Sequence, residues 1–375
     1  MSTADPAGGQ VGVAVVGCGT ISTEYLRNLT SFPDLRVLFC ADLDLERAKA
    51  QAAAFGVPGA GSAAEALARP DVEIVVNLTV PAAHAAISSA AIAAGKSVWV
   101  EKPLTLDSAS ARELLAAADT AGVRIGCAPD TVLGAGLRRA RRLIDSGAIG
   151  QPQTGLALLQ GSGAERWHPD PEFLFKRGAG PLFDMGPYYL TALATIFGPA
   201  TRVAAMGRRA RPTRVIGSGP RAGKEFSVEV PTHVSALIDY KDHQSATIVL
   251  SCDSPFSRRC LLEVTGSSAT LEMPDPNQFT GEVLVDGEVR VDGPAATTPA
   301  SDRAECRGLG VLDLARGLRS GAPPRASGEI GLHVLEIMEA IDRSVATGTF
   351  ESVLTSFTRP AALAEDWDPH ASTLA

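Results

Sequence analysis

The sequence lacks the cysteine patterns that mark disulfide-rich and zinc-binding proteins. Its six cysteines include no Cys-x-x-Cys pair; they are Cys18, Cys40, Cys127, Cys252, Cys260 and Cys306. Scattered cysteines, three of them in or beside expected buried strands, indicate a reduced, cytoplasmic protein without structural zinc. No set of His, Cys and carboxylate residues has the spacing of metal ligands, so we expect no metal ion.

Long apolar runs and an excess of basic residues are missing as well. No apolar run reaches the roughly 20 residues that cross a bilayer. Residues 1–10 have no basic start followed by an apolar core, so we expect no secretory signal. The net charge of −8 argues against a nucleic-acid partner. A cluster of four arginines alternates with apolar residues, which favours a solvated helix face; these are Arg138, Arg139, Arg141 and Arg142.

The composition is that of an ordinary globular protein with a large core. Hydrophobic residues make up 45% and charged residues 20% of the 375 positions. A chain of this length exceeds what one hydrophobic core supports, so we expect two domains.

The stretch Val11–Ser22 organises the first of these domains. An apolar run rich in β-branched residues is interrupted by Gly17 and Gly19 and is followed by a helix-compatible segment, which predicts a strand, a tight turn and a helix. Gly17 allows a sharp turn, and Gly19 allows the backbone to approach a pyrophosphate. The N–H groups and the dipole of the following helix attract that anion.

A second apolar run, Leu35–Ala41, ends in the carboxylate of Asp42. An acid in this place commonly accepts hydrogen bonds from an adenosine ribose; the alternative is a solvated loop acid. Leu43 follows, so no arginine directly after the acid can pair with a 2′-phosphate. We therefore expect NAD rather than NADP.

The first third of the chain alternates strand and helix patterns. Further strands are expected at 72–78, 97–100 and 123–127, separated by Ala-rich helices near 82–94 and 108–121. This alternation predicts a parallel sheet with helices on both faces.

After residue 128 the pattern changes to a helix near 132–146 and then to strands with few intervening helices. The strand candidates are 153–160, 201–206, 226–230, 234–240, 245–251, 260–265 and 270–273. Asp286-Gly287 predicts a hairpin, a late helix is expected at 329–345, and 207–224 and 292–303 read as surface loops. The second domain should therefore contain a largely antiparallel sheet.

Glu101-Lys102-Pro103 stands at the carboxyl end of an expected buried strand, where ligands bind in open α/β sheets. A desolvated lysine near a cofactor can have its pKa lowered enough to transfer protons. The alternative is a surface lysine after a strand.

Gly178–Tyr189 is a glycine-rich approach to a helix that carries Asp184 and Tyr188. Pro187 is tolerated best near a helix start, so we expect Asp184 close to the N-terminus of that helix. At positions i and i+4 the two side chains share a face. A helix cap and a core aromatic are the alternatives for Asp184 and Tyr188.

Three further residues are candidates for substrate contact. Trp167 and His168 precede the glycine-rich turn and could close over a sugar, with an aromatic face against its C–H surface. Asp130 follows the last expected parallel strand. A packing loop and a linker acid are the respective alternatives.

Together these motifs resemble the glucose-fructose oxidoreductase and inositol dehydrogenase (Gfo/Idh/MocA) family; they lie at 17–19, 77–84, 95–103 and 184–186. The resemblance implies an α/β protein with a flexible tail (1–10), an NAD-binding Rossmann domain with a doubly wound parallel sheet (11–128) and a substrate-binding and oligomerisation domain (129–375). The latter would be an α/β domain with a large, mostly antiparallel open sheet, on which relatives build dimers or tetramers.

The resemblance also assigns roles to residues. The implied cofactor-binding residues are Gly17, Cys18, Gly19, Thr20, Ile21, Asp42, Asn77, Thr79, Pro81, His84, Glu101 and Lys102. The substrate would meet Lys102, Asp130, Trp167, His168, Asp184 and Tyr188.

Many members of the family have a proton-transferring histidine where this chain has Tyr188. A tyrosine would need its pKa lowered by about 3 units to act equally well as a base at neutral pH. We therefore expect Lys102 to be the principal acid/base, Asp184 to orient the substrate hydroxyls or the lysine, and Tyr188 to donate a hydrogen bond or shuttle a proton.

Three functions are compatible with these motifs. The first is an NAD-dependent dehydrogenase or reductase acting on a CH–OH carbon of a sugar, a cyclitol or a derivative. The second is a hydrolase or epimerase that keeps NAD bound and oxidises its substrate transiently. The third is a non-catalytic NAD-binding sensor, because fold resemblance alone does not settle function.

Overall fold

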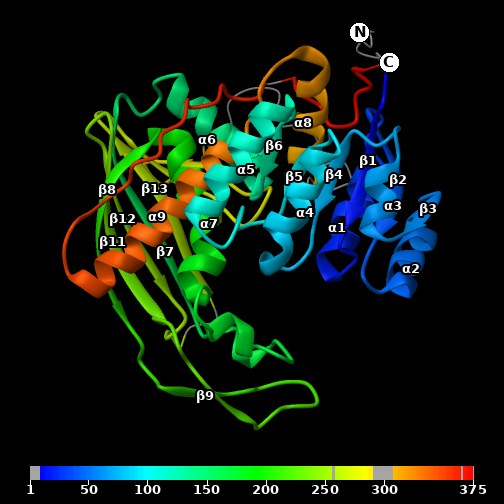
Figure 1. Cartoon of the computed structure of the whole chain (residues 1–375). Helices are drawn as coiled ribbons and strands as arrows, with labels where there is room; N and C mark the ends of the chain where they lie inside the picture. The colour runs from blue at the N-terminus through cyan, green and yellow to red at the C-terminus, as the bar shows by residue number, and fades with distance from the viewer. Residues whose placement is uncertain (1–8, 256–257, 290–306, 365, 375) are drawn as a thin grey trace. The chain divides into compact units, whose positions relative to one another are not determined.

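The computed structural model describes residues 9–255, 258–289, 307–364 and 366–374 (Figure 1). The contacts divide the chain into two compact units. The first comprises 1–134, 297–332 and 360–375, and the second comprises 135–296 and 333–359. The domain ranges 11–128 and 129–375 stay predictions. Cys306, the expected loop at 292–303 and most of the expected tail lie outside the described residues.

The sheet of the first unit has six strands in the order β3-β2-β1-β4-β5-β6, and every pair is parallel. The strands are β1 Val11–Val16, β2 Leu35–Ala41, β3 Gly59–Gly61, β4 Ile74–Asn77, β5 Ser97–Val100 and β6 Ile125–Cys127. This order is that of a dinucleotide-binding sheet. It confirms the predicted parallel sheet.

In its described residues the first unit contains six α-helices: α1 Thr20–Leu29, α2 Leu45–Phe55, α3 Ala63–Ala68, α4 Pro81–Ala93, α5 Ser108–Ala121 and α8 Leu309–Ser320. Asp44, Ser62 and Asp107 cap the N-termini of α2, α3 and α5. Gly56 and Gly122 end α2 and α5 in the left-handed conformation, which glycine adopts without strain. Helix α8 contacts β5 and β6 although it follows them by about half the chain.

The sheet of the second unit has nine strands in the order β16-β15-β14-β13-β7-β12-β11-β8-β17. Its longer strands are β7 Pro152–Gly161, β8 Ala200–Arg208, β11 His233–Tyr240, β12 Ser245–Ser251, β13 Arg258–Gly266 and β14 Thr270–Met273. The edge strands are β15 Leu284–Val285, β16 Glu288–Val289 and β17 Glu351–Ser352. Within this sheet β7 and β12 pair in parallel, and the other pairs are antiparallel. The predicted mostly antiparallel sheet and the hairpin at Asp286-Gly287 are confirmed.

A separate hairpin of β9 Thr213–Val215 and β10 Glu225–Ser227 also belongs to this unit. The prediction that 207–224 forms only a loop is therefore wrong, because Arg214 in β9 is held by buried ion pairs. Phe226 of β10 packs with Phe175, Ile216 and Val228 into a small apolar cluster.

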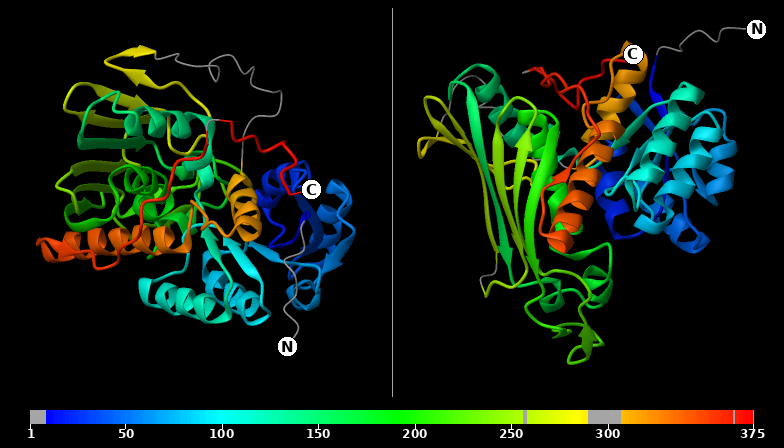
Figure 2. Two further views of the ribbon diagram at one scale, coloured as in Figure 1. Left: turned by 90° about the horizontal axis from the view of Figure 1, so that it is seen from above. Right: turned by 60° about the vertical axis from the view of Figure 1, so that its left-hand side comes forward.

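Among the described residues, the α-helices that accompany the large sheet are α6 Ala135–Asp145, α7 Gly180–Phe197 and α9 Gly328–Thr347, whose first turn belongs to the first unit. Helices α7 and α9 lie on one face of the sheet, and in the described residues no helix covers the opposite face of its central strands (Figure 2). The arginines of α6 are half-buried rather than solvated. Arg141, for example, pairs with Asp145 at 2.7 Å and donates to the Thr195 carbonyl.

Helix α7 begins at Gly180, and Pro187 lies inside it rather than near its start. Asp184 consequently stands more than one turn into the helix. An interior proline removes one intrahelical hydrogen bond. Almost every residue of α7 from Gly186 onward is buried, so packing against the sheet outweighs the local preference of Pro187.

The uncovered sheet face carries two neighbouring rows of mostly apolar residues. Strand register places Ala204, Leu237, Thr247 and Leu156 side by side in one row. The next row contains Met206, Ser235, Val249 and Leu158. Met206, Leu237 and Leu156 are exposed by 66%, 55% and 38%. This set of eight residues is called the open face below.

In the described part of the chain, no helix is long and apolar enough to cross a membrane. The same residues contain no group of His, Cys, Asp and Glu side chains that could hold a metal ion.

His333 on α9 is a buried histidine of the second unit and is 0% exposed. Its Nε2 accepts a hydrogen bond from the Ala200 amide at 2.9 Å, and its Nδ1 lies 2.9 Å from Thr355 Oγ1. Burial lowers the pKa of the imidazole to about 4. The folded protein therefore holds the His333 ring in its neutral form at neutral pH.

This burial predicts a loss of stability in mild acid. An unfolded histidine takes up a proton near pH 6.5, so the contribution of neutral His333 is intact above that pH and is lost as the pH falls to 4. The loss amounts to about 3 kcal/mol. Denaturant unfolding between pH 7 and 4 should show a correspondingly flatter pH dependence for His333→Gln. His233→Gln, at a half-buried histidine on β11, should keep the slope of the parent protein; an unchanged slope in His333→Gln would contradict the assignment.

Candidate functional site

The candidate residues fall into two groups, one in each unit. Those from Gly17 to Asp130 belong to the first unit, and Trp167, His168, Asp184 and Tyr188 belong to the second. Each group is described within its own unit, and the assignment of all these residues to a site stays a prediction.

The turn after β1 is built for close approach of another molecule. Gly17 has φ of +97°, and a Cβ there would stand 2.6 Å from the Leu78 carbonyl carbon. A Cβ at Gly19, by contrast, would meet nothing within 4 Å. Gly19 is the N-cap of α1 and supplies no side-chain hydrogen bond to it. The space beside Gly19 is thus open at the N-terminus of α1, where the first N–H groups of a helix, here including those of Thr20 and Ile21, can bind the pyrophosphate of a dinucleotide.

Asp42 at the end of β2 is oriented toward this turn. Its Oδ2 accepts from the Cys18 amide at 2.7 Å, and its Oδ1 accepts from the Asp44 amide at 2.9 Å. Each carboxylate oxygen can accept a further hydrogen bond, so the group can also receive ribose hydroxyls. Arg47 Nη1 lies 3.9 Å from Oδ1. The sequence argument considered only the residue next to Asp42, whereas the first turn of α2 brings this arginine near.

Asn77 and His84 hold the loop that follows β4. Asn77 Oδ1 accepts from Thr79 Oγ1 at 2.6 Å, and its Nδ2 donates to the His84 carbonyl at 3.0 Å. The His84 ring lies between two backbone carbonyls, with Nδ1 2.6 Å from Pro103 O and Nε2 3.0 Å from Thr79 O. His84 is 1% exposed, and burial lowers its pKa. Its ring therefore fixes the backbone, while the half-buried Thr79 and the exposed Pro81 remain accessible.

The Glu101 carboxylate lies in a buried polar network next to Lys102. Its Oε1 accepts from Tyr25 Oη at 2.8 Å, and Tyr25 Oη accepts from Trp99 Nε1 at 3.1 Å. Glu101 Oε2 accepts from the Lys102 amide at 3.1 Å. The guanidinium of Arg307 approaches Glu101 Oε1 at 3.9 Å. The carboxylate thus orders the start of the Glu-Lys-Pro turn.

Asp130 is fully buried, and its Oδ2 accepts from the amides of Gly308 and Gly310 at 2.8 and 3.1 Å. Burial raises the pKa of this carboxyl group. These contacts tie the turn after β6 to the beginning of α8. Lys102 differs from the fully buried Asp130, because it is only half-buried.

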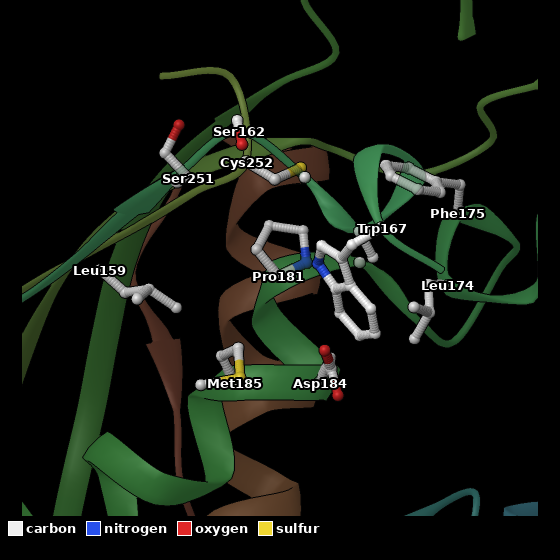
Figure 3. A pocket seen from close by; sticks show the side chains of 14 residues that line it. Leu159, Ser162, Trp167, Leu174, Phe175, Pro181, Asp184, Met185, Ser251 and Cys252 are labelled. Atoms are coloured by element: carbon white, nitrogen blue, oxygen red, sulfur yellow. The ribbon is translucent and has the colours of Figure 1, made fainter. Parts of the chain in front are cut away.

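The second unit contains a pocket of about 180 Å³ beside α7. Figure 3 shows the Trp167 indole beside the Asp184 carboxylate, with Ser162, Ser251 and Cys252 at the other end. Trp167 is 68% exposed. The pocket combines an aromatic face, a carboxylate and two hydroxyl groups, which is the chemistry that recognises a polyol.

His168 and Tyr188 lie beside this pocket rather than in its lining. The His168 ring stands edge-on between Trp167 and Phe173, with centroid distances of 5.5 and 5.4 Å. Tyr188 follows Asp184 by one turn of α7 and is 4% exposed. The structure therefore brings Trp167 and Asp184 together directly and places His168 as a support for the indole.

A buried ion cluster that the sequence argument missed holds the pocket wall. The Arg214 guanidinium, 1% exposed, donates to Glu165 and to Asp253. It also donates to the Cys252 carbonyl at 3.1 Å and stacks on Phe175 at 5.0 Å. These residues are far apart in the sequence and form no motif, so only the fold could reveal them. Tyr25 was also missed, because a tyrosine on an amphipathic helix is normally interpreted as a core residue.

Two family models match the chain. The model described as "Oxidoreductase family, NAD-binding Rossmann fold" matches residues 11–128, and the "GFO/IDH/MocA C-terminal domain" matches residues 137–272. Together they span about two-thirds of the chain.

Curated relatives and a solved structure are similar over most of their length. An uncharacterized oxidoreductase, ORF334, from Rhizobium meliloti is 27% identical over 348 residues, which are 90% of this chain and 98% of the relative. A D-apiose dehydrogenase from Paraburkholderia graminis is 25% identical over 340 residues, 89% of this chain and 88% of the relative. The crystal structure of an NAD binding oxidoreductase from Klebsiella pneumoniae has a TM-score of 0.81 at 22% identity and covers 92% of this chain and 100% of that one.

The open space at Gly19 predicts that adding one methyl group there weakens NAD binding without lowering the stability of the fold. Gly19→Ala should leave the thermal midpoint of unfolding unchanged, because its φ of −75° suits alanine and the Cβ meets no protein atom. The methyl group would occupy space needed by the pyrophosphate, so calorimetry should show NAD affinity lowered by about tenfold or more. Gly17→Ala should instead lower the midpoint, because of its clash and its positive φ. Unchanged NAD affinity in Gly19→Ala would contradict this use of the turn.

Proposed function

Because this chain belongs to the Gfo/Idh/MocA family of NAD-binding oxidoreductases, we propose that it transfers hydride between NAD and a CH–OH carbon of a sugar, a cyclitol or a derivative. The observation that carries the choice of substrate is the pocket beside α7. Its exposed Trp167 and its Asp184 carboxylate offer an apolar face and a hydrogen-bond acceptor to one ligand. The name of the D-apiose dehydrogenase relative supports the same class of substrate.

The residues of this chain have separate tasks in the proposed reaction. The nicotinamide, when bound, supplies the hydride acceptor or donor. Lys102 takes the proton of the substrate hydroxyl on oxidation and returns it on reduction. Asp184 accepts hydrogen bonds from substrate hydroxyls and so fixes which carbon presents its C–H bond. Tyr188 donates a hydrogen bond or relays the proton, and its burial keeps bulk water away.

The surroundings of Asp42 support NAD over NADP as the preferred cofactor. Its carboxylate already receives two backbone amides and stands where an adenosine ribose is held in this fold. A 2′-phosphate would meet this negative charge at close range. Arg47, at 3.9 Å and with a side chain 53% exposed, offers only a solvent-screened compensation.

The direct test is the absorbance of reduced nicotinamide with purified protein, NAD or NADP and a panel of sugars and cyclitols. We expect reduction with a limited set of substrates and a higher kcat/KM for NAD. Lys102→Met should lower kcat by at least about a hundredfold, because general acid/base groups contribute 10²–10⁴-fold, while NAD affinity changes little.

Retained turnover in Lys102→Met would remove Lys102 from the mechanism. Substrate consumed without released NADH would instead favour a reaction on permanently bound NAD, by hydrolysis or epimerisation. No reduction with any substrate, despite NAD binding, would contradict the dehydrogenase.

We also propose that the protein is a homo-dimer or homo-tetramer assembled through the open face. In the described residues no helix covers this face, and its exposed leucine and methionine side chains in adjacent rows form the kind of contiguous apolar patch that marks an interface. A two-fold axis through the open face would bring the apolar rows of two copies together.

Leu237→Asp should therefore dissociate the assembly, because it buries a charge at the centre of the open face. Light scattering coupled to size exclusion measures the molar mass directly. Leu106→Asp, at a leucine that is 60% exposed in the first unit, serves as the control. A monomeric parent protein, or an unchanged oligomer in Leu237→Asp, would contradict this interface.

A further inference from the structure

The backbone around Lys102 is fixed from both sides. On one side its own amide donates to Glu101 Oε2 at 3.1 Å. On the other side the carbonyl of Pro103 faces His84 Nδ1 at 2.6 Å. The contact with Glu101 is part of a chain of hydrogen bonds that extends into the interior of the first unit.

That continuation runs through Tyr25 to Trp99. Tyr25 is 0% exposed, and its phenol donates to Glu101 Oε1 at 2.8 Å. Burial and the charge of Glu101 raise the pKa of Tyr25 well above its ordinary value. The phenol therefore keeps its proton near neutral pH, where it serves as a hydrogen-bond donor.

The orientation of the phenol is set by Trp99, whose indole N–H donates to Tyr25 Oη at 3.1 Å. A Cβ on Gly310 would lie 2.0 Å from the indole ring, and a Cβ on Gly126 would lie 2.6 Å from it. The ring is thus packed directly against α8 and β6. With its one acceptor role taken by Trp99, Tyr25 has its O–H directed at Glu101.

We propose that Tyr25 is a positioning residue for Lys102 and acts through the Glu101 carboxylate. The inference rests on the proposed function, in which Lys102 transfers the proton. Tyr25 lies on α1, the helix whose N-terminus faces the expected pyrophosphate. One rigid chain of hydrogen bonds therefore connects the cofactor helix to the backbone of the proton-transferring residue.

The physical effect is on geometry. With Tyr25 in place, the phenol O–H fixes Glu101 Oε1 while Oε2 holds the Lys102 amide. Without the phenol, Oε1 loses its 2.8 Å donor and keeps the Arg307 guanidinium at 3.9 Å. The carboxylate is then less firmly oriented, and its hold on the Lys102 backbone weakens.

Tyr25→Phe in the full-length protein tests this coupling. We expect kcat to fall by about ten- to a hundredfold, the range for a misplaced catalytic group, with NAD affinity and the thermal midpoint close to those of the parent. The pH profile of kcat should also shift along its lysine-dependent limb. Tyr240→Phe is the matched control, because in the described residues the Tyr240 hydroxyl is buried without a hydrogen-bond partner.

A double-mutant cycle with Glu101→Gln separates positioning from general packing. If Tyr25 acts through Glu101, Tyr25→Phe should cost far less in the Glu101→Gln background than alone. Additive effects, or a Tyr25→Phe enzyme with the parent kcat and pH profile, would overturn the proposal. Should Tyr25→Phe lower the thermal midpoint strongly, the coupling is read from kcat of Glu101→Gln, whose single amide oxygen can accept from only one of the Tyr25 phenol and the Lys102 amide. A Glu101→Gln enzyme with the parent kcat would then overturn the proposal.

The Lys102→Met variant distinguishes a failure of the proposed function from a failure of the positioning role of Tyr25. Activity in Lys102→Met would remove the proposed function together with the positioning role. An inactive Lys102→Met beside a fully active Tyr25→Phe would remove only the positioning role.

Discussion

The parallel register of the first sheet is the constraint on which the candidate site of that unit depends. It aligns Ala41, Val16, Asn77, Val100 and Cys127 across five neighbouring strands. The residues that follow these five, among them Asp42, Gly17 and Glu101, must then emerge along one edge of the sheet. Residues that are far apart in the sequence meet there because all six strands run the same way.

The buried charged groups have different kinds of partner in the two units. In the first unit, Glu101 and Asp130 each satisfy backbone amides, and the raised pKa of Asp130 reflects the cost of its burial. In the second unit, Arg214 forms ion pairs with two carboxylates at once, those of Glu165 and Asp253, beside the pocket wall. Such pairs contribute little net stability, but they define the position of the backbone around them. In both candidate regions, buried polar groups therefore fix the backbone.

The sequence was informative wherever one segment carries its own signal. Gly17 and Gly19 marked the turn after β1, alternation marked the strands of the second sheet, and Asp286-Gly287 marked its hairpin. Prediction failed where tertiary packing decides, as for Pro187 inside α7 and for β9, which is held by Arg214. It could not find Tyr25 or the Arg214 cluster, because their partners lie in distant segments. Helix α8 was missed because its glycines lower the helix propensity of the segment, and one of them, Gly310, is there because it packs against Trp99.

The composition of the first unit has a consequence for how the chain acquires its structure during synthesis. Helix α8 supplies the amides that receive Asp130, and Thr373 and Leu374 donate to Asp34. Helix α8 leaves the ribosome after β7 to β16, and residues 373 and 374 leave it after β17 as well. The nascent dinucleotide-binding unit therefore keeps Trp99 and the Asp130 carboxylate uncovered until most of the second unit has been synthesised. Its core begins first along the chain and is closed late.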